Sequence, residues 1–281
     1  MKHWLFSIGL LVLLLTVLPG HAGTLAQFRT TIGDFDVELY DAEKPVTVKN
    51  FIRYVQEGLY TDMFMHRVVT NFVIQGGGIF VGDRGTTNAA LYYIPTFSPI
   101  TNEFGVGKFY SNTYGTIAMA KTSDPNSATS QFFFNLTNNA AALDNTNNSG
   151  GFTVFGRVVS GTNILNRFKL GPTNQVIKKL NLGGVLSELP VLYAADPAYV
   201  SYDDLVYVDI SLLQVAVNPV TDGGKEISWN SAAGLTNIVE FTAGFPPAWN
   251  TLALTNGTGT RMAVVDAAAT PRRFYRVRVA Y

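Results

Sequence analysis

The stretch MHRVVTNFVIQGG, residues 65–77, decides the fold of this sequence. Two apolar runs meet in it, Met63–Val69 and Phe72–Gln75, and a run of glycines ends it. Short runs that are rich in β-branched residues and bounded by glycine are typical of strands. Side chains alternate between the two faces of a strand, so Val73 and Gln75 are expected to share one face.

The run Gln131–Asn135 repeats this pattern on a second predicted strand. Gln131 and Phe133 are expected on one face, and Phe132 and Phe134 on the other. An amide beside an apolar side chain on two separate strands favours a partly apolar cleft with a few hydrogen-bonding groups.

The sequence on both sides of these two strands predicts a mainly β protein. Thr24–Tyr40 alternates on both sides of Gly33-Asp34 and predicts a β-hairpin, while apolar residues spaced i, i+3, i+4, i+7 between Pro45 and Gly58 predict an amphipathic helix. Other predicted elements are strands over Gly115–Met119, Phe152–Val158 and Val206–Leu213, and a helix over Thr162–Lys169 with Thr162 as its cap and Gly171-Pro172 as its stop. The predicted irregular segments are residues 79–113, 123–127, 144–151 and 171–205. This order indicates a closed antiparallel barrel with helices over its open ends.

Short strands restart after about residue 215. They are predicted over Glu226–Trp229, Asn237–Phe241, Arg261–Val265 and Phe274–Val279. Residues 215–281 are therefore interpreted as a small all-β module, which looks like a short fibronectin-type-III domain. Its Trp229 and Trp249 are either core residues, which we favour, or a carbohydrate site. Its arginine-rich run from Arg272 to Arg278 is either a solvated strand face, which we favour, or an anion site.

The amino-acid composition excludes several kinds of functional site. The 281 residues include 20 basic and 20 acidic side chains, three histidines and no cysteine. The lack of cysteine excludes disulfides, thiolate nucleophiles and cysteine-ligated metal, and the balanced charge gives no support to a nucleic-acid partner.

Residues 1–22 have the pattern of a secretory signal peptide. Lys2 precedes an apolar run over Trp4–Leu18, and Pro19-Gly20 breaks the run ahead of Ala22. Cleavage after Ala22 predicts an exported protein, periplasmic or extracellular, whose one histidine is His66. The alternative is an uncleaved anchor, although the run of 15 residues is shorter than the roughly 20 that a bilayer needs.

Four blocks resemble, in order, the signature of the cyclophilin family of peptidyl-prolyl cis-trans isomerases. They are residues 65–77, Gly115–Lys121, Ser130–Asn135, and Leu143-Asp144 with Val154–Val158. The resemblance covers about residues 24–213 and is nearest to bacterial secreted members. It implies an eight-stranded antiparallel barrel with two helices, and rotation about X-Pro bonds as the activity.

That reaction breaks no covalent bond. It crosses an amide rotation barrier of roughly 18–20 kcal/mol, so it requires no nucleophile, metal or cofactor. A catalyst has to stabilise the twisted amide, whose nitrogen regains a lone pair, and to hold the proline ring in a dry pocket.

The resemblance also implies roles for ten residues. Arg67 is expected to donate to the prolyl nitrogen, Gln75 to orient the arginine, and Phe72 to complete the catalytic set. The expected substrate-binding residues are Val73, Ala120, Lys121, Gln131, Phe133, Leu143 and Phe152, with Ala120 and Lys121 acting through their backbone. His66 is expected to be structural, because alternation points it away from Arg67.

Three positions depart from the family pattern. Ala142 stands where an aromatic residue often precedes the Leu-Asp pair, Phe152 where histidine or tyrosine is common, and Val73 where many members have methionine. The missing aromatic ring predicts weak cyclosporin binding.

Proline-containing unfolded or extended polypeptides are the expected partners. The leading hypothesis is an isomerase that assists the folding of exported proteins. The alternative is a module that binds proline-containing segments without catalysis, and residues 215–281 are further considered as a tether to an envelope component.

Overall fold

The computed structural model describes residues 24–169, 176–196, 198–213, 215–231, 236–258, 260–267 and 272–280. The predicted signal peptide and the predicted Gly171-Pro172 stop lie outside these residues. Every helix within the described ranges is too short or too polar for a membrane span.

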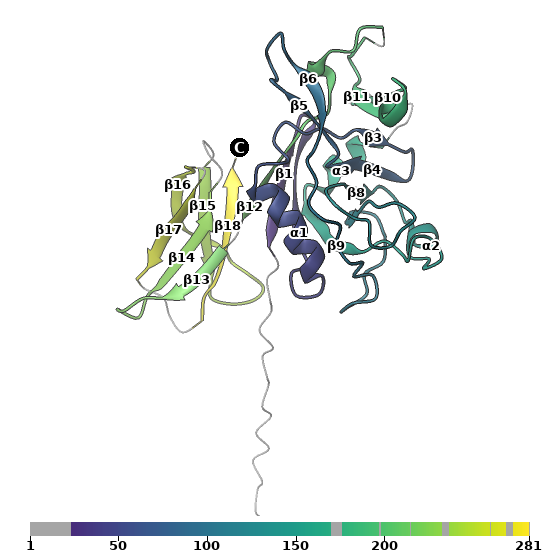
Figure 1. Ribbon diagram of the computed structural model, residues 1–281. Helices are drawn as coiled ribbons and strands as arrows, with labels where there is room; N and C mark the ends of the chain where they lie inside the picture. Colours follow the sequence, from purple (N-terminus) through teal and green to yellow (C-terminus); the bar gives the residue numbers. More distant parts are fainter. Residues whose placement is uncertain are drawn as a thin grey trace, which may run out of the picture.

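One antiparallel sheet of eight strands forms the main body, and it curls around the core (Figure 1). Its strand order is β12-β1-β2-β9-β7-β8-β4-β3. The strands are β1 (Leu25–Thr30), β2 (Gly33–Leu39), β3 (Arg67–Val68), β4 (Val73–Gly76), β7 (Thr116–Met119), β8 (Phe132–Asn135), β9 (Val154–Ser160) and β12 (Val208–Leu213). The predicted hairpin over Thr24–Tyr40 is confirmed, since β1 and β2 pair along their whole length.

The apolar run Met63–Val69 is a strand of this sheet only at Arg67–Val68. Its first residues bond instead to the segment that leads into β12. The Met65 amide donates to the Val206 carbonyl at 2.9 Å, and the Val208 amide donates to the Met63 carbonyl at 3.0 Å. The run therefore changes its pairing partner midway, which explains why β3 is shorter than the apolar pattern.

Aromatic rings fill the inside of the sheet. Phe28 stacks on Phe35 with 5.1 Å between ring centroids and meets Phe134 edge-on at 5.1 Å and Phe132 edge-on at 5.8 Å. Phe51, from helix α1 (Pro45–Gln56), meets Phe132 edge-on at 5.6 Å. The predicted division of β8 is thus confirmed, because Phe132 and Phe134 point into this core and Phe133 belongs to a separate cluster on the other face.

Two further helices are short, α2 (Ala140–Leu143) and α3 (Thr162–Arg167), and η1 (Gly184–Leu186) and η2 (Tyr202–Asp204) are single 3-10 turns. The predicted cap of α3 is wrong: Gly161 is the N-cap, and Thr162 is the first helical residue. Gly161 has φ +71°, and a Cβ there would lie 2.4 Å from the Asp34 carbonyl oxygen. The close approach of β2 therefore requires glycine at the cap position.

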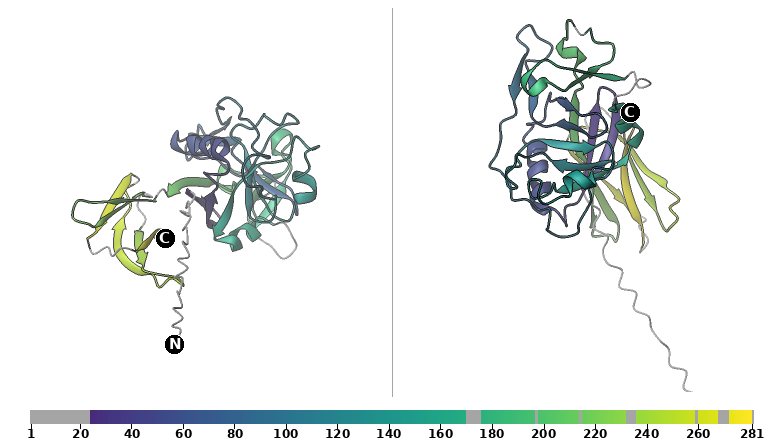
Figure 2. Two further views of the ribbon diagram at one scale, coloured as in Figure 1. Left: turned by 90° about the horizontal axis from the view of Figure 1, so that it is seen from below. Right: turned by 90° about the vertical axis from the view of Figure 1, so that its right-hand side faces the viewer.

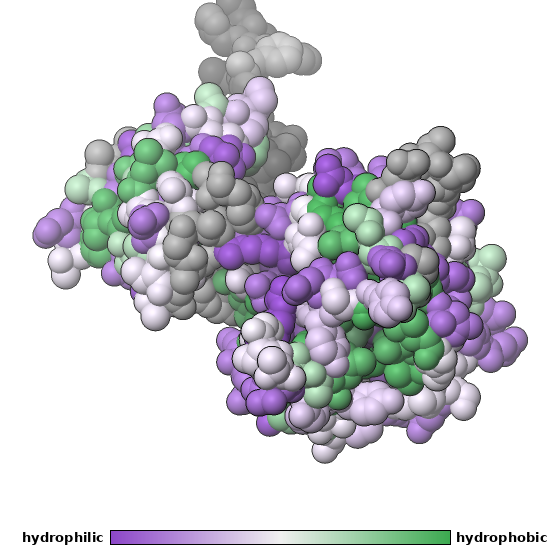
Figure 3. Space-filling view, turned by 90° about the horizontal axis from the view of Figure 1, so that it is seen from above, coloured by the Kyte–Doolittle hydropathy of each residue, from purple (hydrophilic) through white to green (hydrophobic). Residues whose placement is uncertain are grey.

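Two hairpins occur where the sequence predicts irregular structure. They are β5 (Ile79–Gly82) with β6 (Ala90–Tyr93), and β10 (Ile177–Leu180) with β11 (Leu189–Leu192). Their exposed apolar side chains include Leu91, Tyr92, Tyr93, Leu182 and Val185. Figure 3 looks down on the end of the molecule that carries both hairpins and shows hydrophobic patches on the main body. Strand β6 is mostly exposed and β11 is buried at three successive residues, so neither strand shows the alternation on which the prediction depends.

The C-terminal part forms two three-stranded sheets beside the main body (Figure 2). One has the order β13 (Val215–Pro219), β14 (Lys225–Asn230), β17 (Arg261–Asp266), and the other has β16 (Asn250–Asn256), β15 (Thr236–Thr242), β18 (Phe274–Ala280). The sequence pattern misses β13 and β16. Ile227, Trp229, Val239 and Val277 form the core between the sheets. Trp229 is fully buried and its indole N–H donates to Asn237 at 3.1 Å, so it is a core residue.

Candidate active site

The register of three neighbouring strands brings the predicted polar and apolar residues together. Arg67 on β3 lies opposite Gln75 on β4, and Gln75 lies opposite Phe133 on β8. Residues directly opposite each other in antiparallel strands project to the same face. Val73 follows on that face because it is two residues from Gln75. A row of side chains therefore crosses the outer face of the sheet.

This row forms one side of a cavity of about 320 Å³, which we call the cleft. Nine of the ten predicted site residues line it: Arg67, Phe72, Val73, Gln75, Ala120, Lys121, Phe133, Leu143 and Phe152. The tenth, Gln131, lies beside the cleft and accepts a hydrogen bond from the Gln75 amide at 2.7 Å. Gln131 lines a neighbouring hollow of about 230 Å³ that shares Arg67 and Gln75 with the cleft.

The polar side of the cleft is a chain of hydrogen bonds. Arg67 donates through Nη1 to the Gln75 side-chain oxygen at 3.3 Å, and Gln75 donates in turn to Gln131. Arg67 also donates through Nε to the carboxylate of Glu188 at 2.8 Å. The guanidinium is thus held from two directions at the edge of the cleft.

The apolar side comes from four separate parts of the chain. Phe133 and Leu143 are almost fully buried, and Phe152 meets Phe133 edge-on with 5.9 Å between ring centroids. Phe72 is held by its backbone, because its carbonyl accepts from the Leu136 amide at 2.9 Å. These residues form an apolar wall opposite the guanidinium. A cleft with one apolar and one cationic side is suited to bind an apolar ring that carries a polar group.

Lys121 contributes its side chain as well as its backbone, which the sequence does not predict. Its ammonium donates to the carbonyls of Ser149 at 2.5 Å and Gly151 at 2.6 Å and lies 4.9 Å from the centre of the Phe152 ring. Burial lowers the pKa of this ammonium to about 8. The lysine therefore fixes the polar loop over residues 144–151 and, through it, the position of Phe152.

The glycines after β4 have a steric cause. Gly77 has φ +78°, and a Cβ there would lie 2.5 Å from the Ser130 carbonyl oxygen. The chain must pass this close because β4 lies against β8, which carries Phe133. Glycine at this position is therefore a requirement of the cleft floor.

Asp144, the second residue of the Leu-Asp pair, holds the rim of the cleft. Its carboxylate accepts from the Ser111 hydroxyl at 2.5 Å and from the Asn112 backbone and side-chain N–H groups at 3.0 and 2.8 Å. These bonds attach α2, and with it Leu143, to the loop before β7. The pair thus combines an apolar wall residue with its anchor.

His66 is buried beside Arg67, and both line the hollow next to the cleft together with Gln131. The prediction that alternation points His66 away from Arg67 is therefore wrong, because strand β3 begins only at Arg67. The side chain of His66 is 5% exposed, and its Nδ1 has no hydrogen-bond partner within the part of the chain that the structure describes. Burial and, to a smaller extent, the charge of Arg67 lower the pKa of the imidazole to about 4, against the opposing effect of a hydrogen bond with Gln131. His66 is thus neutral at physiological pH.

This pKa makes the free energy of unfolding depend on pH. An unfolded histidine binds its proton near pH 6.5, whereas folded His66 binds it only near pH 4. The stability is fully present above about pH 6.5 and is lost as the pH falls toward 4, by on the order of a few kcal/mol. Urea midpoints at pH 7 and pH 4.5 are expected to differ less for His66→Gln than for the wild type. Equal differences in both proteins would show that another group carries the effect.

Glu188 is the functional candidate that the sequence does not reveal. It lies in the segment predicted as an irregular connection, 121 positions after Arg67, and no motif marks it. A lone glutamate in a polar segment is ordinarily a solvated surface residue. Only the folded arrangement shows that it contacts the guanidinium.

The cleft is not the largest hollow. A cavity of about 570 Å³ lies against β2 and β9, lined by residues that include Glu38, Tyr40, Lys108, Tyr110 and Arg157. None of the predicted site residues lines it. The described residues also include no cluster of three acidic or histidine side chains that could hold a metal ion.

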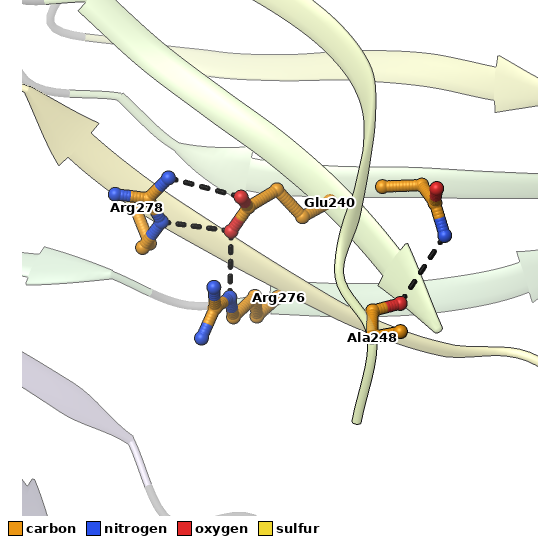
Figure 4. Close-up of polar contacts among 5 residues, drawn as sticks. Glu240, Ala248, Arg276 and Arg278 are labelled. Carbon is orange, nitrogen blue, oxygen red and sulfur yellow. Dashed lines mark hydrogen bonds and ion pairs between the residues drawn. The ribbon is translucent and has the colours of Figure 1, made fainter. Parts of the chain in front are cut away.

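Two arginines of β18 share one carboxylate. Arg278 and Arg276 donate to the carboxylate of Glu240 at 2.7 and 2.6 Å (Figure 4). The hydrogen bonds from Arg278 and Arg276 hold the pKa of Glu240 at about 2. Arg276 also lies 4.1 Å from the centre of the Trp249 ring. Trp249 is only half-buried, so the prediction that it is a core residue is wrong.

Comparisons with known proteins show the family to which the chain belongs. The model of the family described as cyclophilin type peptidyl-prolyl cis-trans isomerase/CLD matches residues 25–183. A peptidyl-prolyl cis-trans isomerase of Acinetobacter baylyi is 39% identical over 153 residues, covering 54% of this chain and 76% of the relative. Peptidyl-prolyl cis-trans isomerase B of Escherichia coli is 39% identical over 151 residues, covering 52% and 84%. Among solved structures, one match is a Cryptosporidium parvum cyclophilin type peptidyl-prolyl cis-trans isomerase, crystallised in the presence of the dipeptide Ala-Pro. Its sequence is 22% identical, the match covers 67% of this chain and 98% of that chain, and the TM-score is 0.44.

Proposed function

The chain belongs to the cyclophilin type peptidyl-prolyl cis-trans isomerase family and is an isomerase of X-Pro bonds. We propose that its cleft holds the proline ring of the substrate while Arg67 acts on the amide. The observation that carries the proposal is the position of Arg67 and Gln75 at the edge of a cavity whose other wall is apolar. Loss of activity on replacing Arg67, measured with a proline-containing peptide, is the direct test.

The proposed mechanism follows from how an amide resists rotation. Resonance imposes a barrier of roughly 18–20 kcal/mol, and it is lost as the bond twists. The prolyl nitrogen then regains a lone pair that accepts a hydrogen bond. A guanidinium N–H aimed at that nitrogen stabilises the twisted amide more than the planar one, which is the condition for a faster chemical step. A guanidinium group carries its charge throughout the physiological pH range, which makes arginine a suitable donor for this step.

The apolar wall contributes in a second way. Phe133, Leu143 and Phe152 exclude water from the proline ring, and a hydrogen bond in a dry site is stronger than the same bond in water. Together with Phe72 and Val73, these residues orient the ring so that the amide nitrogen faces the guanidinium. Ala120 and Lys121 lie on the continuation of β7 beyond Met119, where an extended peptide would run beside the backbone.

We propose that the substrates are unfolded or extended segments of exported proteins. The support is the pattern of residues 1–22, a basic residue, an apolar run and small residues at the expected cleavage point. The protein recovered from outside the cytoplasm is expected to begin at Gly23. An N-terminus at Met1 in that fraction would favour the retained anchor instead.

Weak cyclosporin binding is the expected consequence of Ala142. This residue is exposed on α2, directly before Leu143, and offers a methyl group where an aromatic ring would cover the rim of the cleft. Burying an additional aromatic side chain contributes about 1.5–3 kcal/mol, so Ala142→Trp is expected to tighten cyclosporin binding by roughly tenfold or more. Inhibition of prolyl isomerisation measures this.

The matched control is Ala141→Trp, which adds the same ring at the neighbouring exposed position of α2. No tightening is expected there. If the wild type already binds cyclosporin at low nanomolar concentration, the assigned role of Ala142 is wrong.

We extend the proposal to two details of the fold. The main sheet closes into a barrel through the hydrogen bonds between residues 63–65 and 206–208, and the C-terminal sheets form a fibronectin-type-III-like sandwich. The hydrogen bonds of Met65 and Val208 support the closed barrel, and the two three-stranded sheets around Trp229 support the sandwich. A crystal structure of residues 23–281 would check both.

A further inference from the structure

The carboxylate of Glu188 touches the guanidinium of Arg67 although 121 positions separate them. The Arg67 Nε lies 2.8 Å from Glu188 Oε2, a normal length for a charge-assisted hydrogen bond. The arginine side chain is 41% exposed and the glutamate side chain 27%, so water screens the pair in part. Geometry, more than charge energy, is therefore what this contact supplies.

The main chain of Glu188 is attached to the same strand as Arg67. The Val68 amide, one residue after Arg67, donates to the Glu188 carbonyl at 2.7 Å. The next residue, Leu189, begins β11, and it is fully buried with Val191 in a small cluster beneath the hairpin. Strand β3 thus holds the backbone of both partners, which fixes where the carboxylate lies relative to the guanidinium.

The second oxygen of the carboxylate has its own neighbour. Lys179, on β10 of the same hairpin, lies 3.6 Å from Glu188 Oε1. The glutamate is therefore held between a lysine from its own hairpin and the arginine of the cleft. This arrangement limits the rotation of the carboxylate away from Arg67.

Two contacts fix the plane of a guanidinium. Arginine has five N–H groups, and Arg67 uses the one on Nε for Glu188 and one on Nη1 for Gln75. Within the described residues, this leaves three N–H groups of Arg67 for a substrate. With Gln75 alone, the guanidinium would be free to turn about that single bond.

We propose that Glu188 is a positioning residue for the isomerase reaction, which holds Arg67 so that its remaining N–H groups meet the X-Pro amide. The inference rests on the proposed function of Arg67. The family match ends at residue 183, so the carboxylate comes from a part of the chain beyond that match. The hairpin of β10 and β11 thereby supports the arginine of the cleft without lining the cleft itself.

Replacing Glu188 with alanine tests this. A 1 Å misplacement of a reacting group can cost roughly a hundredfold in rate, and a guanidinium with one contact left is expected to lose roughly tenfold in kcat. The KM is expected to stay within about twofold, because the oriented donor acts on the twisted amide and the apolar wall is unchanged. Glu188→Gln keeps an acceptor oxygen and is expected to lie between Glu188→Ala and the wild type.

A double-mutant cycle separates positioning from general damage to the fold. If Glu188 acts through Arg67, then Glu188→Ala lowers the rate in the wild type but has no further effect on Arg67→Ala. The matched control is Glu38→Gln, which removes a carboxylate from Arg157, an exposed pair on β2 and β9 away from the cleft. That variant is expected to keep the wild-type rate.

Three results would overturn the role of Glu188. They are an unchanged or higher kcat in Glu188→Ala, the same tenfold loss in the Arg67→Ala background, and a wild-type rate in Glu188→Gln together with a lowered unfolding temperature in Glu188→Ala. If Arg67→Ala itself keeps full activity, the proposed function of the arginine fails instead. The two failures are therefore distinguishable in one set of measurements.

Discussion

Replacing Arg67 with alanine is expected to lower kcat/KM for prolyl isomerisation by roughly 10²–10³-fold, the usual cost of losing a donor that acts on the transition state. At about 1.36 kcal/mol for each factor of ten, this is about 3–4 kcal/mol of transition-state stabilisation. Among the described residues that line the cleft, the guanidinium of Arg67 is the cation that an amide, that of Gln75, orients. A protease-coupled assay with a proline-containing peptide measures the loss.

Arg157→Ala is the matched control for this experiment. Arg157 also belongs to the main sheet, on β9, and pairs with the carboxylate of Glu38 at 3.1 Å, but it does not line the cleft. Its removal is expected to leave the rate unchanged. Equal rates for Arg67→Ala and the wild type would remove the arginine from the mechanism.

Replacing Phe28 with alanine is expected to lower the free energy of unfolding of the main body by about 3–5 kcal/mol. Phe28 is fully buried and meets four other rings, those of Phe35, Phe51, Phe132 and Phe134, at centroid distances between 5.1 and 6.1 Å. Its loss removes apolar burial and leaves a cavity that these rings cannot fill without moving. Tyr199→Ala, at a side chain that is 82% exposed, is expected to change the stability by less than about 0.5 kcal/mol.

The positions of the tryptophans decide how this should be measured. They occupy positions 4, 229 and 249, so both tryptophans after the predicted leader belong to the C-terminal part, Trp229 on β14 and Trp249 directly before β16. Tryptophan emission therefore reports the C-terminal part, and the loss of isomerase activity in urea reports the main body. A Phe28→Ala activity midpoint equal to that of the wild type would contradict the assigned importance of this ring.

The first two strands of the main sheet are predictable because apolar residues alternate with polar ones along them. Phe28, Phe35 and Val37 alternate with polar residues, and this alternation places β1 and β2 nearly to the residue. The division between Phe133, at the cleft, and its two neighbours in the core follows from the same rule. The sequence pattern fails at β6 and β16, where exposed and half-exposed residues carry no alternation to detect.

The cleft is predictable for a different reason and only in part. Eight of the nine lining residues fall in short motifs that resemble those of a known family, and the resemblance implies the role of each; Phe152 lies two positions before the last of these motifs. Glu188 and the side-chain bonds of Lys121 fall outside any such motif, because they depend on loops that meet only in the folded chain. Local patterns report what a residue does within its own strand or helix, and these two contacts lie between segments far apart in the sequence.

The pairing of Leu25 with Leu213 determines how mechanical load would pass through the protein. Leu25 opens β1 and Leu213 ends β12, so the main body begins and ends at one rung of the same ladder. Strand β13 starts at Val215, two positions further along the chain. A pull between the N-terminal end and the C-terminal sheets would therefore load the Leu25–Leu213 rung first and leave β3, β4 and β8 off the path of force. An enzyme tethered at both ends would keep its cleft unstrained while the tether is under tension.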